Sequence, residues 1–153
     1  EDRRLITLAE KVYNNAELEN PIAPSDTAVK FVGFLERCRK EWGFAKDVYI
    51  DNADQATMTE LKKYRRLNGC IYNFWDAYKK LEILDRIKLQ LGWIQQDCYL
   101  VVDECPEHLA ELEKYSWEED KDKPEDRNDH TINAGQYSWI PYRNMIGYEE
   151  DKK

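Results

Sequence analysis

A short apolar strand that runs directly into a carboxylate limits what this chain can fold into. Residues 48–54 open with β-branched and aromatic side chains and reach Asp51 after three positions. A helical pattern over residues 31–46 precedes this run, and a second over residues 58–64, closed by Asn68–Gly69, follows it. Helix, strand, strand-end acid and helix is the order expected of an α/β sheet with helices against its faces.

The acid at the end of this strand is a candidate functional residue. In α/β sheets, ligands bind beyond the carboxyl ends of the strands, so Asp51 is a candidate metal ligand or general base. The alternative is that this aspartate caps the next helix or turn. Both interpretations stay open from the sequence.

The rest of the chain continues the alternation of strands and helices. We predict strands over residues 5–13 and 98–102, and helices over residues 81–93 and 107–115. Residues 14–26 read as a loop, in which Ser25 or Asp26 is the predicted N-cap of the following helix. The first strand begins so near Glu1 that we expect a hairpin partner upstream of it.

We predict one domain over residues 1–153, with an acidic loop at 117–128 and a charged tail at 138–153. The content of 42% hydrophobic and 12% aromatic residues is enough for a sizeable core. No apolar run approaches the roughly 20 residues that cross a bilayer, and no signal peptide is recognisable. We therefore expect no membrane association.

Charge and cysteine content narrow the function classes. The net charge of −8 argues against nonspecific nucleic-acid binding by the surface as a whole, although a carboxylate-centred phosphodiesterase would also be acidic. Basic residues gather at 37–40, 62–66 and 79–80. The four cysteines lack CxxC spacing, which favours reduced thiols in a cytosolic protein; a four-cysteine zinc site is the alternative.

A second polar cluster opens a predicted late helix. At helical spacing Asp129, His130 and Asn133 lie on one face. Together with Asp51 they could hold Mg²⁺ or a similar hard cation, and two such ions can drive phosphodiester hydrolysis. The alternative is that Asp129 is an N-cap and its neighbours are ordinary polar residues. We interpret His108 as structural or solvated, in an acidic surface segment.

Several motifs occur in an order that is similar to a known family. They are residues 49–54, 60–64, 79–80 and 83–87, then Cys105, residues 111–117, Pro124 and residues 128–137. In this order they resemble the C-terminal nuclease domain of the terminase large subunit of tailed bacteriophages, of the type found in phages and prophages of Gram-positive bacteria. The resemblance covers roughly residues 5–137.

The resemblance implies an RNase H-like fold, with a central mixed β-sheet flanked by α-helices. It implies an endonuclease that cuts concatemeric double-stranded DNA during genome packaging, with Mn²⁺ or Mg²⁺ at a two-metal site. Asp51 matches the second catalytic carboxylate and His130 the histidine of the late motif. Asn133 stands at the third metal-binding aspartate, and Lys79 and Lys80 would meet DNA phosphates.

The chain departs from the family pattern in two places. The first catalytic aspartate would lie upstream of Glu1, and Asn133 lacks the charge of the expected carboxylate. Asp129 could compensate by binding the second metal. The implied partners are a terminase ATPase domain, the small terminase subunit and the portal protein, in the host bacterial cytoplasm. The alternative function is a catalytically impaired module of the same fold that docks DNA or packaging proteins.

Overall fold

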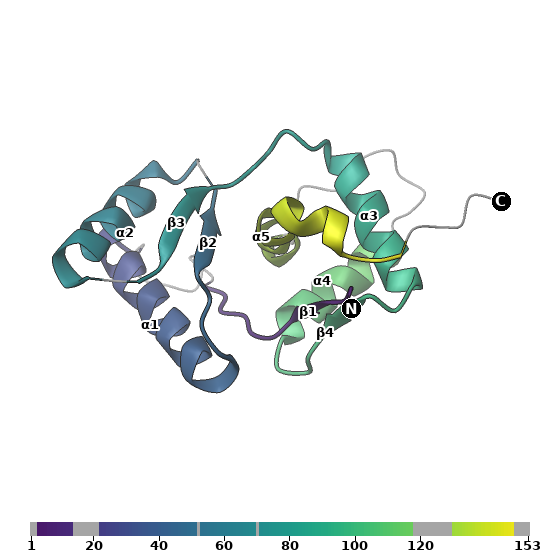
Figure 1. The fold of residues 1–153 in the computed structure, drawn as a ribbon, viewed down its shortest axis with the longest axis horizontal. Helices are drawn as coiled ribbons and strands as arrows, with labels where there is room; N and C mark the ends of the chain where they lie inside the picture. The colour runs from purple at the N-terminus through teal and green to yellow at the C-terminus, as the bar shows by residue number, and fades with distance from the viewer. Residues whose placement is uncertain (1–2, 14–21, 52, 70, 118–129, 149–153) are drawn as a thin grey trace. The chain divides into compact units, whose positions relative to one another are not determined.

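The computed structural model describes residues 3–13, 22–51, 53–69, 71–117 and 130–148 (Figure 1). The chain is a mixed α/β protein, as the sequence predicts. The structure groups into two compact units, and the single domain over residues 1–153 stays a prediction. One is Lys11–Ala77, and the other combines Glu1–Glu10 with Tyr78–Lys153. The structure defines each unit by itself.

The first unit, Lys11–Ala77, is called the β2–β3 unit after its strands. It contains α1 (Pro24–Trp42), β2 (Asp47–Ile50), α2 (Gln55–Asn68) and β3 (Asn73–Asp76). The two strands pair in parallel, with Val48 opposite Phe74 and Ile50 opposite Asp76, and α2 forms the crossover between them (Figure 1). Parallel pairing needs such a crossover, so the predicted strand–helix order produces this arrangement.

The core of the β2–β3 unit is almost entirely apolar. Its buried residues come from both helices and both strands: Ala28, Val32, Leu35, Val48, Met58, Leu61, Tyr72 and Phe74. Leu61 is completely buried. The buried residues of the two helices stand at helical spacing and pack in one cluster with Val48 and Phe74 from the strands.

Both helices of this unit have clear local boundary signals. Asp54 caps α2 by accepting a hydrogen bond from the Thr57 N–H at 3.1 Å. Gly69 ends α2 with a φ of 62°, a left-handed conformation that favours glycine. Helix α1 begins earlier than predicted, with Pro24 in its first turn and Ala23 at the N-cap, so the predicted caps Ser25 and Asp26 are wrong.

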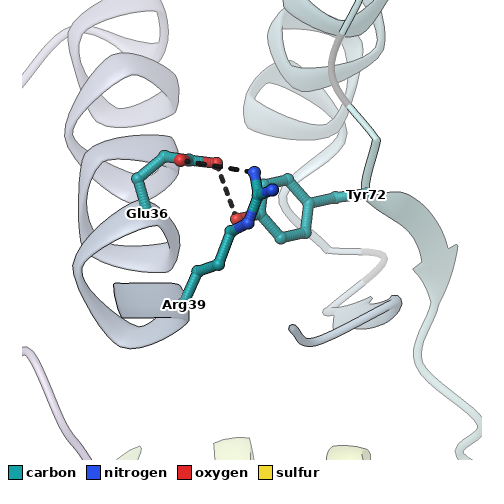
Figure 2. Close-up of polar contacts among 3 residues, drawn as sticks. All are labelled: Glu36, Arg39 and Tyr72. Carbon is teal, nitrogen blue, oxygen red and sulfur yellow. Dashed lines mark hydrogen bonds and ion pairs between the residues drawn. The ribbon is translucent and has the colours of Figure 1, made fainter. Parts of the chain in front are cut away.

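Tyr72 connects α1 to the segment that leads into β3. Its ring is buried, and its hydroxyl donates to Glu36 Oε1 at 2.8 Å (Figure 2). On the other side of the carboxylate, Arg39 Nη1 lies 3.8 Å from Glu36 Oε2 (Figure 2). Glu36 thus holds the tyrosine hydroxyl and a neighbouring cation at the rim of the apolar core.

The second unit, Glu1–Glu10 with Tyr78–Lys153, is called the β1–β4 unit. Its elements are β1 (Leu5–Thr7), α3 (Ile83–Gln95), β4 (Tyr99–Val101), α4 (Pro106–Trp117), α5 (His130–Trp139) and the 3₁₀ helix η2 (Ile140–Met145). Strands β1 and β4 pair in parallel, with Leu5 opposite Tyr99. The strand predicted over residues 5–13 is therefore confined to its first three residues.

Aromatic residues from α3 and α5 form the centre of the β1–β4 unit. The rings of Trp93 and Trp139 meet edge to face, with centroids 4.7 Å apart. Ile140 is completely buried beside them. Residues 138–148 are thus part of the fold, which differs from the charged tail predicted from residue 138; the apolar side chains at its start bring this segment into the core. Residues 118–128 of the predicted acidic loop lie outside the described residues.

The described strands form two parallel pairs, so the structure supports the α/β class and leaves the central mixed sheet of an RNase H-like fold as a prediction. Within the described part of the chain, no helix combines the length and apolarity that a membrane span requires.

Candidate functional site

Asp51 lies directly after β2, at the carboxyl end of the strand. Its Oδ1 accepts a hydrogen bond from the Ala53 N–H at 3.0 Å, and its carbonyl accepts from the Asp54 N–H at 3.1 Å. The turn-capping alternative is therefore part of its role. The capped carboxylate is half-buried at the strand end, where the sequence predicts a ligand-binding residue.

The carboxyl ends of β2 and β3 share one edge because the strands are parallel. Asp76 stands opposite Ile50 in the register, and the Ala77 N–H donates to the Ile50 carbonyl at 2.8 Å. Asp54 also belongs to this edge, but its side chain caps α2. Among the residues that the structure describes, no three His, Cys, Asp or Glu side chains form a group that could hold a metal ion. Asp51 fits as one carboxylate ligand, and a complete ligand set needs further donors.

His130 and Asn133 lie on α5, in the β1–β4 unit. His130 is the first residue of the helix and is exposed, and Asn133 is half-buried one turn later. Their spacing places them on one face of α5, as predicted. Asp129 lies outside the described residues. That Asp51, in the β2–β3 unit, joins these residues in one site stays a prediction.

The two lysines predicted to meet DNA precede α3, and both are exposed. The Lys79 Nζ lies 5.6 Å above the ring of Tyr137. The Lys79 carbonyl oxygen accepts a hydrogen bond from Arg86 Nη2 at 3.2 Å. Asn133 and Tyr137 are four residues apart on α5, so the structure brings Lys79 to the same helix face as the candidate ligands.

The β1–β4 unit contains a buried chain of hydrogen-bonded side chains that was not predicted from the sequence. The Tyr99 hydroxyl lies 2.7 Å from His108 Nε2, and His108 Nδ1 lies 3.0 Å from Thr131 Oγ1. Thr131 Oγ1 in turn makes a short hydrogen bond to the Glu111 carboxylate. His108 is only 2% exposed. Of the two predicted roles, structural or solvated, burial supports the structural one. The predicted surface location is wrong, because α4 turns this side chain into the core.

The acid at the end of this chain fixes the direction of its hydrogen bonds. A carboxylate only accepts, so Thr131 donates its hydroxyl hydrogen to Glu111 and accepts from His108 Nδ1–H. The unprotonated Nε2 of His108 then accepts from the Tyr99 hydroxyl. Burial raises the pKa of Tyr99 to about 12, although a hydrogen bond with the Thr7 side chain opposes this. Burial also lowers the pKa of His108, although the negative charges of Glu111 and Glu10 oppose this shift. Both rings are therefore neutral near pH 7.

Two glutamates link this chain of side-chain hydrogen bonds to the N-termini of α4 and α5. Glu10 accepts from the backbone N–H groups of Glu107 at 2.8 Å and His108 at 2.9 Å. Glu111 Oε2 accepts from the N–H groups of Thr131 and Ile132, both at 3.0 Å. Carboxylates at helix N-termini satisfy free N–H groups and complement the helix dipole. The chain thereby fixes the first turn of α5, which carries His130.

No local sequence signal identifies these partners. Glu10 lies 98 residues from His108, and Glu111 lies 20 residues from Thr131. Capping motifs that are recognisable in a sequence join residues two or three positions apart. The described cysteines, Cys38, Cys98 and Cys105, are free thiols.

The chain was compared with protein-family models, with curated proteins and with solved structures, and no match was found in any of the three.

Proposed function

We propose that this chain is a metal-dependent endonuclease domain of RNase H-like fold that hydrolyses double-stranded DNA, as the nuclease part of a phage terminase. The observation that carries the proposal is the Asp51 carboxylate at the shared carboxyl edge of two parallel strands. Support also comes from the order of motifs that resembles the terminase nuclease. In this function the ATPase domain, the small subunit and the portal would be partners in the host cytoplasm.

The proposal assigns a separate role to each group of residues. Asp51 would hold Mn²⁺ or Mg²⁺, and Asp129, His130 and Asn133 would complete or tune the ligand set. When bound, such ions stabilise charge on the phosphodiester oxygens and lower the pKa of water. Lys79 and Lys80 would contact phosphates beside the α5 face, where Lys79 lies over Tyr137.

Cleavage of supercoiled plasmid in Mn²⁺ tests the proposal, in a chain extended by the upstream strand that the resemblance implies. Asp51→Asn is expected to lower the rate about 100-fold or more, since loss of a metal ligand removes several kcal/mol of transition-state stabilisation. Asp26→Asn is the matched control, because this exposed aspartate lies in the first turn of α1. Equal cutting by Asp51→Asn and the native chain would refute the role of Asp51.

Calorimetric titration with Mn²⁺ gives a readout that does not depend on cutting. Binding is expected in the native chain and in Asp26→Asn, and is expected to weaken strongly in Asp51→Asn. Asn133 favours the alternative of a docking module, because an amide supplies an oxygen without the charge of a carboxylate. A native extended chain that binds DNA but neither binds Mn²⁺ nor cuts would establish that alternative.

A further inference from the structure

A basic pocket lies on the β2–β3 unit, over the C-terminal half of α2. It has a volume of about 510 Å³ and is lined by Lys62, Arg65, Arg66, Gly69 and Phe74. The three cations stand at i, i+3 and i+4, so they share one helix face. All three are exposed, while Phe74 from β3 is buried beneath them. No acidic side chain occurs among the described residues that line this pocket.

One of the three cations in the pocket is held in place by a neutral partner. Arg65 Nη2 donates to Asn73 Oδ1 at 3.1 Å, which orients the guanidinium toward the start of β3. The side-chain amide of asparagine is neutral, so Arg65 keeps its full charge. Within the described part of the chain, neither Lys62 nor Arg66 forms a salt bridge. A chain with a net charge of −8 thus carries a concentrated positive pocket.

Helix stability alone does not account for this cluster. Arg65 and Arg66 lie in the last turn of α2, where cations complement the helix dipole. Lys62 stands one turn earlier, outside the range of that effect. Small-molecule sites are concave and mostly apolar, whereas this pocket is lined mainly by exposed cations. Spaced cations on an open surface suit the repeating phosphates of a polymer backbone.

We propose that the pocket formed by Lys62, Arg65 and Arg66 binds the phosphate backbone of a nucleic acid. The pocket shares no residue with the candidate nuclease site, and its binding does not require metal or cleavage. The recognition is electrostatic and independent of base sequence, because these side chains meet phosphates rather than base edges.

The test is fluorescence anisotropy of a labelled 30-base-pair duplex with the whole chain, in EDTA, across a series of salt concentrations. Lys62→Gln/Arg66→Gln keeps the Arg65–Asn73 hydrogen bond and removes two charges. It is expected to weaken binding at least about tenfold at low salt, and to reduce the slope of log affinity against log salt by about 2. Arg37→Gln/Lys40→Gln removes two exposed charges from α1 of the same unit and is expected to change neither quantity appreciably.

Three outcomes would overturn the proposal. The α2 variant could bind like the native chain, or the α1 control could lose as much affinity as the α2 variant, which would reduce the effect to total charge. Inorganic phosphate could also bind the native chain and not the α2 variant, with no duplex binding by either, which would identify a site for a single phosphate. Duplex binding in EDTA that persists in Asp51→Asn keeps this test separate from the nuclease proposal.

Discussion

The two units of this protein treat buried polar groups in opposite ways. In the β2–β3 unit, Thr57 is the one buried polar side chain among the described residues, and the core is otherwise apolar. The β1–β4 unit buries Arg86, Gln90, His108 and Gln136. An apolar core depends on close packing and is insensitive to pH, whereas a buried titratable chain depends on every hydrogen bond being made. The comparison predicts that the units respond differently to substitution and to pH.

The largest expected effect is a cavity in the apolar unit. Leu61→Ala removes a completely buried side chain from α2 and is expected to cost about 3 kcal/mol of unfolding free energy. Leu67→Ala, in the same helix at a residue 68% exposed, is the matched control and is expected to be nearly neutral. Urea denaturation measures both. A loss in Leu61→Ala that varied between pH 5 and 8 would contradict the distinction between the units.

A pH series tests the buried polar chain of the β1–β4 unit. The folded pKa of His108 lies below its unfolded value, so its contribution is fully present above about pH 6.5 and is lost as pH falls through the folded pKa. The pKa of Tyr99 is raised to about 12, so its contribution is present below about pH 10 and is lost as pH rises toward 12.

The variant His108→Leu separates the contribution that is lost at acidic pH from the one that is lost at alkaline pH. It is expected to cost about 2 kcal/mol at pH 7.5, because it leaves the Tyr99 and Thr131 hydroxyls with one partner fewer. It should also reduce the loss of stability as the pH falls, which is measured by the midpoints of urea denaturation from pH 5 to 8. His130→Leu, at the exposed first residue of α5, is the control. If His108→Leu lost as much stability at acidic pH as the native chain, a group other than His108 would be responsible for that loss.

The smallest expected effect compares a local helix cap with a distant one. Asp54→Ala removes the cap of α2 and is expected to cost about 1 kcal/mol. Hydrogen exchange should detect the loss first in the opening turn of α2. Glu10→Ala removes the acceptor at α4 and also separates the end of the β1 segment from that helix. Its effect should therefore extend into β4 as well as α4. Loss confined to the first turn of α4 would make the two caps equivalent.

Several features follow from short-range sequence patterns. Residues 48–50 form a strand, and Gly69 ends α2, because β-branched side chains and a left-handed glycine act within a few positions. The position of Asp51 after β2 follows from the same run. The helices at residues 81–93 and 107–115 are each found within two residues of their predicted limits.

The candidate site was predictable only in part. The spacing of His130 and Asn133 on α5 follows from the helical period, and Asp51 follows from the end of its strand. The position of Lys79 above Tyr137 depends on packing between segments far apart in the chain. The basic pocket on α2 shows both contributions. Its three cations stand at helical spacing, while Phe74, which lines the pocket, and Asn73, which accepts from Arg65, come from β3.

The sequence by itself determined the alternation of strands and helices, the carboxylate at the end of β2 and the C-terminal end of α2. These depend on side-chain periods and on caps that act over one turn of the chain. The tertiary structure alone decided that Glu10 and Glu111 cap helices far along the chain, that His108 is buried between Tyr99 and Thr131, and that Ile140 joins a core. A buried polar group needs a hydrogen-bond partner at about 3 Å, and only the tertiary packing of the folded chain decides which distant residue supplies it.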